Sequence, residues 1–532
     1  MSFLLESRLV RGALVGALIL LFAFLLFRNI GVKPSGIEGD EFAVVLGSYL
    51  HDHGIPPVEK GIWSVHQDTF DQYPFTRWIP QVGFRLFGDD LLSPRKFLIL
   101  LKAGSLLFLF LSLRNLTSFS TAICILLLYA FGTLHLLSSV VVIEGSLCEP
   151  WIALSLYLLT RVRMVRHGPL RILTLVGAGA AVTATLFTYN IVYGFSFCAV
   201  LTVFVEVFRQ GNGSFKKKIA WLFCFLIPIA AFSPLWLRPF RSQASSRSYA
   251  LEYSALKEGL SVEQRLKAVT FNARFAGGQL LRPLLYEGSD MLATYPARLV
   301  PPLFSLLGLA GLVFLFARGK RWWPYGTLFV VNAGLYQVLM GLWLPRMWLI
   351  TIFGLAILAS FGTERLLEFA RRHSRRAAIV ANTILLLASA GTAYSQWRLF
   401  SDHGALAPRL TGPSREMVEV AETYRLSAPG SVLFSIADPA FRNQFLTARA
   451  FVDLAKGKVD PAVVRTETLE SLSIYSEEGL LSSDELSDRR VRRVVVFMDS
   501  SSLANPLVAA GFKPVPSPWR FFTEFTRDAG GS

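Results

Sequence analysis

Long apolar runs alternate with polar stretches along most of this chain. A helix needs about 20 apolar residues to cross the roughly 30 Å hydrocarbon core of a membrane. About eleven runs approach that length, and we interpret each as a transmembrane helix: 13–29, 97–113, 121–141, 150–160, 172–187, 191–208, 220–236, 299–317, 324–342, 347–363 and 377–395. Arg8 and Arg11 precede the first run, but no small-residue cleavage site follows it, so we predict an uncleaved span rather than a signal peptide.

Lysine and arginine are concentrated in alternate loops between these runs. The basic segments are 1–12, 114–120, 161–171, 209–218, 318–321 and 364–376. Because basic loops stay on the cytoplasmic side, we expect a cytoplasmic N-terminus and an extracytoplasmic C-terminus. Three long polar regions, 30–96, 237–298 and 396–532, then lie on the outer face of a plasma membrane, which we take to be a bacterial inner membrane.

Composition agrees with a membrane protein and changes the meaning of the charge. The 532 residues are 53% hydrophobic and 17% charged, with a mean hydropathy of +0.46, which excludes a disordered chain, a disulfide scaffold and an ordinary cytosolic enzyme. A net charge of +16 could indicate nucleic-acid binding. The six basic segments hold 19 Lys and Arg and three acids, which accounts for all of that excess. We therefore expect no nucleic-acid partner.

The C-terminal region differs from the rest of the chain. Short β-branched or aromatic runs at 431–436 and 494–498 predict strands, and the stretches 413–425 and 462–482 predict helices. We expect a transmembrane domain over 1–395 and a small extracytoplasmic α/β domain over 396–532. That domain has no glycine-rich phosphate-binding fingerprint, so no nucleotide cofactor is expected.

Charged residues within the spans are few. Lys102 and Glu206 lie within a turn or two of the ends of their spans. A transporter or proton pump needs polar groups near the membrane midplane, so the sequence does not favour either of these functions. We therefore look for chemistry at the outer surface.

Three acidic positions reach that outer surface. Asp40 and Glu41 begin a short amphipathic stretch, where carboxylates either cap a helix and complement its dipole or serve catalysis. Asp71 lies in a later part of the same loop, and Glu149 precedes Pro150 at the start of the fourth span. An active site on this face would require such residues to converge.

The same stretches resemble the GT-C superfamily of membrane glycosyltransferases, especially the protein mannosyltransferase and lipid A aminoarabinose transferase branch. Asp40-Glu41 is similar to the acidic pair that this family keeps after its first span. Phe70-Asp71-Gln72-Tyr73-Pro74, followed by Trp78, Leu86-Phe87-Gly88 and Arg95, resembles its F-E-K-P-P…W…LFG…R run. Glu149-Pro150 resembles its Asp-x-Pro site, and Pro345-Arg346-Met347 resembles, more weakly, its P-R-Y-L-L-P segment. Gln72 replaces the family's lysine, and Arg77 could take its place.

The resemblance implies an inverting transfer of a sugar from a polyprenyl-phosphate donor to an acceptor hydroxyl on the outer face. A carboxylate must take the hydroxyl proton, and cations or a metal must stabilise the leaving phosphate. The candidate catalytic residues are Asp40 (the base), Glu41, Asp71 and Glu149, and the candidate phosphate-binding residues are Arg77, Arg274, Arg282 and Arg346. A divalent ion is a further expectation, with His51, His53 and His66 as its candidate ligands.

Two other classes of function stay open from the sequence. The chain could be a non-catalytic scaffold in envelope assembly, or a transporter of lipid-linked glycans. The acceptor could be a lipid, a cell-surface glycan or a protein. Convergence of Asp40, Asp71 and Glu149 on one lipid-facing cavity would favour the transferase.

Overall fold

A computed structural model gives the fold, and two compact units are present in it. The first, here called the helical unit, comprises residues 1–34, 70–79 and 95–407; the second, the mixed unit, comprises 35–69, 80–94 and 408–532. The residues described are 8–30, 39–55, 73–165, 168–188, 192–209, 214–237, 254–255, 257, 259–281, 300–318, 323–341, 348–403, 412–427, 431–437, 439–456, 474–482, 484–497 and 501–527.

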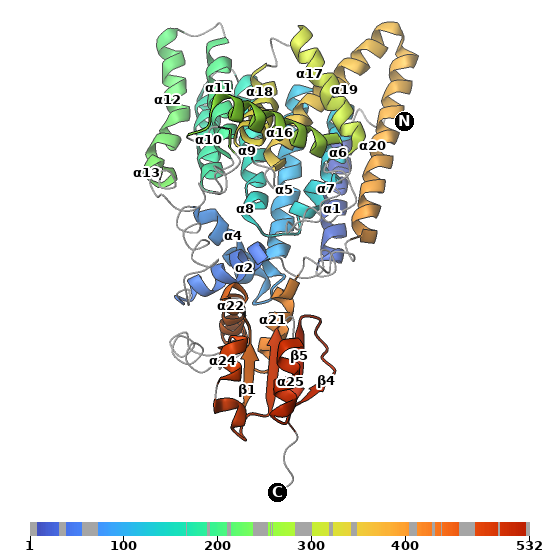
Figure 1. Ribbon diagram of the computed structural model, residues 1–532. Helices are drawn as coiled ribbons and strands as arrows, with labels where there is room; N and C mark the ends of the chain where they lie inside the picture. The colour runs from blue at the N-terminus through green and yellow to red at the C-terminus, as the bar shows by residue number, and fades with distance from the viewer. Residues whose placement is uncertain are drawn as a thin grey trace. The chain divides into compact units, whose positions relative to one another are not determined.

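The helical unit is built from helices that run side by side, with α16 lying across them (Figure 1). Its elements are α1 (Arg8–Asn29), α5 (Ser93–Leu116), α6 (Phe119–Ala130), α7 (Thr133–Ser138), α8 (Glu144–Leu147), α9 (Glu149–Met164), α10 (Pro169–Leu186), α11 (Tyr193–Arg209), α12 (Phe215–Ala231), α13 (Ser233–Trp236), α16 (Val262–Leu281), α17 (Pro302–Arg318), α18 (Trp323–Val331), the π-helix η4 (Asn332–Leu339), α19 (Leu349–His373) and α20 (Arg375–His403). Helix α4 (Pro74–Phe87) begins in this unit and ends in the other.

Five described helices are long and apolar enough to cross a membrane: Leu9–Asn29, Ser93–Leu116, Pro169–Leu186, Leu349–His373 and Arg375–Ser401. Shorter apolar helices cover Phe119–Ala130 and Pro302–Ala317. The helical membrane architecture expected from the sequence is present, and the count of about eleven spans stays a prediction.

Several apolar runs are not single α-helices. The run 121–141 is divided, because α6 ends at Ala130 and Gly132 adopts an extended conformation before α7 begins. The run 324–342 changes from α18 to the π-helix η4. Residues 262–281 form α16, a helix that lies within the predicted outer loop 237–298 and that its hydropathy did not reveal.

Close backbone contact holds α17 against α19. A Cβ atom at Gly311 would overlap the carbonyl of Leu358, and one at Gly362 would overlap the carbonyl of Leu307. Small residues let membrane helices approach closely, so van der Waals packing replaces the missing hydrophobic driving force between them.

The mixed unit contains one five-stranded sheet with the order β2-β1-β3-β5-β4. Its strands are β1 (Val432–Ser435), β2 (Ile474–Tyr475), β3 (Arg493–Phe497), β4 (Lys513–Val515) and β5 (Phe522–Thr526). Strand β1 pairs in parallel with β2 and β3, whereas β5 is antiparallel to β3 and β4. Its helices are α2 (Gly39–Asp52), the end of α4, α21 (Gly412–Thr423), α22 (Pro439–Ala455), α24 (Glu477–Leu481), the 3₁₀ turn η6 (Asp484–Ser487) and α25 (Ser501–Ala509).

Alternating side chains give the sheet two buried faces. Leu433, Val494 and Phe525 pack in one cluster with Leu503 and Leu507 of α25. On the other face Phe434 and Phe522 contact Phe445 of α22. The period of two therefore places a helix on each side of the sheet.

Both predicted strands are present, as β1 and β3. The predicted helix 462–482 is wrong at Ile474–Tyr475, which form β2 and pair with β1, whereas Glu477–Leu481 form the short helix α24. Residues 462–473 lie outside the described residues.

Candidate functional site

The predicted acidic pair lies in the first turn of α2. Asp40 and Glu41 follow Gly39, the first residue of that helix. Glu41 is buried, with 1% of its surface exposed, and the side chain of Asp40 lies outside the described residues. Carboxylates in this position complement the helix dipole, and this local effect requires no ligand.

Aromatic contacts fix α2 within the mixed unit. Tyr49 lies 4.9 Å from the ring of Phe84 at the end of α4 and 5.1 Å from Phe451 of α22. Burial and then the nearby carboxylate of Asp89 raise the pKa of Tyr49. The helix that carries Asp40 therefore packs against the α/β fold formed by the end of the chain.

The predicted metal-ligand histidines make local contacts. His53 Nδ1 lies 2.9 Å from the Tyr49 carbonyl oxygen, and its ring packs on Tyr49. His51 is half-buried at the end of α2, and Asp52 pairs with Arg85 at 3.1 Å. The described residues include no group of three His, Cys, Asp or Glu side chains arranged to hold a metal ion. His66 lies outside them.

The start of α4, which directly follows the F-D-Q-Y-P run, contacts α9 in the helical unit. Asp71 lies outside the described residues, but Phe75 stacks on Trp151 with ring centroids 4.8 Å apart. Thr76 donates a hydrogen bond from Oγ1 to the Thr188 carbonyl oxygen at 3.0 Å, which ties the start of α4 to the end of α10. The structure thus places the start of α4 beside the helix that begins with the Glu149-Pro150 motif.

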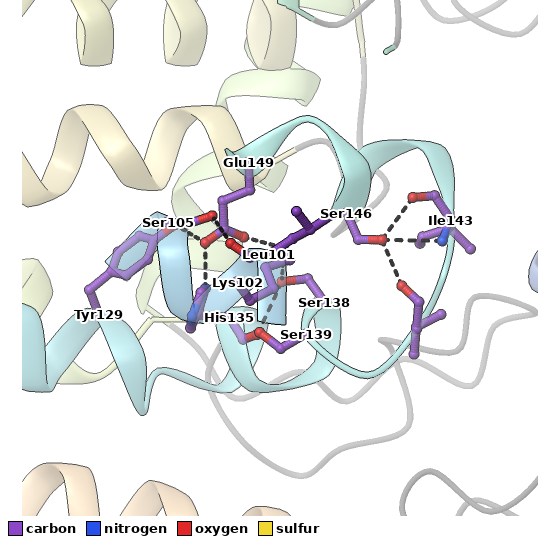
Figure 2. Close-up of polar contacts among 11 residues, drawn as sticks. Leu101, Lys102, Ser105, Tyr129, His135, Ser138, Ser139, Ile143, Ser146 and Glu149 are labelled. Carbon is purple, nitrogen blue, oxygen red and sulfur yellow. Dashed lines mark hydrogen bonds and ion pairs between the residues drawn. The ribbon is translucent and has the colours of Figure 1, made fainter. Parts of the chain in front are cut away.

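Glu149 lies at the centre of a buried polar cluster (Figure 2). Lys102 of α5 forms an ion pair with its Oε2. Tyr129 of α6 donates a hydrogen bond to Oε1 at 3.0 Å, and His135 Nδ1 of α7 lies 2.8 Å from the same oxygen. Lys102 also donates to Ser138 Oγ at 3.2 Å. We call these five residues the Glu149 cluster.

The sequence interpretation missed most of this cluster. The sequence pattern indicates Lys102 only as a charge near the end of a span, and it gives no signal for Tyr129, His135 or Ser138. An intramembrane lysine requires a partner, and this requirement is the signal that could have prompted a search for a carboxylate.

The predicted phosphate-binding cations are dispersed or undescribed. Arg77 is half-buried in the first turn of α4, and Arg274 is exposed on α16. Arg282 and Arg346 lie outside the described residues. The structure therefore leaves their convergence on a phosphate as a prediction.

Known proteins resemble the chain both in sequence and in fold. A family model described as dolichyl-phosphate-mannose-protein mannosyltransferase matches residues 71–237. The fold is similar to that of ArnT from Cupriavidus metallidurans bound to undecaprenyl phosphate, with a TM-score of 0.59, 13% identity and coverage of 99% of this chain and 100% of that chain. The chain therefore has the same fold as this ArnT. The apo state of the same ArnT gives a TM-score of 0.58 at 13% identity, covering 97% of this chain and 98% of that chain.

No curated protein matches the sequence. The resemblance to the GT-C superfamily that the first outer loop suggested is confirmed at the level of fold, and the chain is a multi-pass helical membrane protein. At 13% identity the roles of individual residues do not follow from the fold.

Proposed function

We propose that this protein transfers a sugar from a polyprenyl-phosphate donor to an acceptor hydroxyl at the outer face of a bacterial inner membrane. The likeness to an ArnT structure that holds undecaprenyl phosphate, over nearly the full length of both chains, is the observation that carries this proposal. The match of residues 71–237 to a family that uses a lipid-phosphate sugar supports it. The acceptor that we favour is an envelope glycan or lipid.

In the proposed reaction the acceptor oxygen attacks the anomeric carbon of the donor. A new carbon–oxygen bond forms as the bond to the phosphate oxygen breaks, so the configuration at that carbon inverts. Asp40 takes the hydroxyl proton, and polyprenyl phosphate leaves with the bonding electron pair. Glu41 and Asp71 are proposed to complete the acidic side of the site.

The leaving phosphate gains negative charge that cations must stabilise. Arg77, Arg274, Arg282 and Arg346 are the side chains that we propose for this task. A divalent ion could share it, with His51, His53 or His66 among its ligands. Transfer measured before and after treatment with a chelator, with Mg²⁺ or Mn²⁺ added back, tests that expectation.

The direct test uses purified protein in proteoliposomes that contain a panel of polyprenyl-phosphate sugars and candidate acceptors. Release of polyprenyl phosphate by the wild type, and its loss in the Asp40→Asn variant, would support the proposal. Asp484→Asn is a matched control because Asp484 is exposed in the mixed unit. Full activity of Asp40→Asn would exclude Asp40 as the base, and binding of a lipid-linked sugar without turnover would favour the scaffold or transporter.

A further inference from the structure

We propose that Lys102, Tyr129 and His135 are positioning residues that hold Glu149 and the segment Ser139–Cys148 in the conformation required for transfer, and that Glu149 does not accept the acceptor's proton. The catalytic part of this inference rests on the proposed function. It changes the role of Glu149 from a candidate catalytic residue to the anchor of a buried loop.

The carboxylate of Glu149 is buried and already has three partners. Its side chain has no exposed surface, and a carboxylate offers about four lone-pair sites on its two oxygens. Tyr129 and His135 occupy Oε1, and Lys102 occupies Oε2. A general base must reach the proton that it removes. Glu149 could do so only after this cluster came apart.

The charges of the Glu149 cluster balance one another. The Lys102 ammonium compensates the Glu149 carboxylate, and a neutral His135 adds no charge to the cluster. Nδ1 of His135 lies 2.8 Å from Oε1, and the ring stacks on Phe22 with the centroids 5.3 Å apart. His135 is therefore held between an apolar ring and the carboxylate.

Burial of an ion pair such as Lys102–Glu149 costs free energy. Desolvation often exceeds the Coulombic gain, so apolar side chains of similar size would stabilise a bundle equally well or better. Four elements, α5, α6, α7 and α9, each contribute a member of the Glu149 cluster. The directional contacts of the cluster specify one arrangement of these elements, which a set of apolar side chains would specify less well.

Glu149 directly follows a buried segment of the chain, residues 139–148. Residues 139–148 connect α7 to α9, and their described side chains are buried although most of the backbone is not helical. Ser146 satisfies part of this backbone: its Oγ donates to the carbonyls of Val141 at 2.6 Å and Ile143 at 2.8 Å, and it accepts from the Ile143 amide at 3.1 Å. Buried non-helical backbone must find its hydrogen-bond partners inside the protein.

Anchors at both ends fix this segment. At its start, Ser139 Oγ donates to the His135 carbonyl oxygen at 2.6 Å, and His135 itself contacts Glu149. At its end, Glu149 and Pro150 begin α9. The segment ends directly before Glu149, which the sequence predicts at the outer surface, so its conformation would shape the face on which transfer is proposed.

A double-mutant cycle separates positioning from proton transfer. We expect Lys102→Met and Glu149→Gln each to lower kcat by about 100-fold or more while the donor KM changes less than about threefold, and the double variant to recover within about tenfold of wild type. The acid limb of the pH profile should persist in the double variant because another carboxylate accepts the proton. A double variant as inactive as Glu149→Gln, or one without the acid limb, would overturn the proposal.

Tyr129→Phe provides a milder variant if the single charge changes prevent folding. It removes one hydrogen bond to Oε1 and should lower kcat by roughly tenfold with the donor KM unchanged. Wild-type kcat in this variant would count against the positioning role of Tyr129. Glu263→Gln, which breaks an exposed pair with Lys267 on α16, is the matched control and should leave transfer unchanged.

Hydrogen–deuterium exchange tests the structural part without any substrate. We expect faster exchange over 139–149 in each single charge variant and wild-type protection in the double variant. Unchanged exchange in the singles would overturn the anchoring role. If the wild type transfers no sugar, the proposed function fails, and the exchange result still decides whether the Glu149 cluster holds the segment.

Discussion

Lys102 and Glu149 are 47 positions apart, yet they form an ion pair in which neither side chain has any exposed surface. The pair joins α5 to the first residue of α9. Because Tyr129 and His135 contact the same carboxylate, the α6–α7 region joins this pair as well. The Glu149 cluster therefore connects elements that the hydropathy pattern treats as independent spans.

Removal of one charge from this pair should be costly. We expect Glu149→Gln to lower the free energy of unfolding by about 3–5 kcal/mol, because Lys102 would stay buried without a counter-charge. Denaturant unfolding in detergent micelles measures the change. Glu263→Gln alters a pair that is 75% exposed and should cost less than about 1 kcal/mol. Equal effects of the two substitutions would show that the buried pair has no special weight.

Hydropathy predicted the helical architecture because lipid-facing helices need long apolar runs. It did not predict the break at Gly132, since the run on both sides stays apolar. It also missed α16, whose charged residues Glu263, Arg265 and Lys267 make its sequence resemble a polar loop. The Glu149 cluster was beyond pattern analysis because its members lie on different elements, and only the packing brings them together.

The close approach of α17 and α19 gives a second prediction. Gly311→Ala should lower the free energy of unfolding by about 1–3 kcal/mol, because a methyl group there would overlap the Leu358 carbonyl and force the helices apart. Gly104→Ala in α5 is the matched control, since nothing lies within 4 Å of a Cβ at that position. Alanine also has the higher helix propensity, so the control should be neutral or stabilising. Similar thermal unfolding of the two variants would contradict the packing argument.

A carboxylate from α19 caps the start of α6. Glu364 Oε2 accepts hydrogen bonds from the Ser118 amide at 2.9 Å, Ser118 Oγ at 2.6 Å and Thr121 Oγ1 at 2.7 Å. Glu364→Ala should therefore cost about 1–3 kcal/mol, because these donors would lose their acceptor. Glu368→Ala removes a half-buried pair with Arg365 and should cost less than about 1 kcal/mol. Unfolding of both variants, measured under one condition, would show whether the cap dominates.

The mixed unit was predicted only in part. The β-branched runs gave β1 and β3, because strands packed on both faces are apolar and short. The sequence did not indicate that α2 from the first outer loop packs on α22, as the contact between Tyr49 and Phe451 shows. That contact joins residues about 400 positions apart, and no local pattern encodes such a pairing.

Alkaline pH should destabilise the mixed unit through Tyr424, which is 4% exposed. Burial raises the pKa of Tyr424 to about 12, and the nearby Glu524 carboxylate acts in the same direction. In the unfolded chain the phenol ionises near pH 10. Between about pH 10 and pH 12 the unfolded state therefore releases a proton that the folded state keeps, and stability falls as the pH rises.

The Tyr424→Phe variant cannot ionise at this position. We expect the difference in unfolding free energy between wild type and this variant to be constant below about pH 9 and to shift by at most about 2 kcal/mol in favour of the variant by pH 12. Urea titrations followed by tryptophan fluorescence provide the measurement, since Trp519 lies 6.0 Å from the Tyr424 ring. Parallel pH curves for wild type and Tyr424→Phe would mean that Tyr424 ionises alike in the folded and unfolded states.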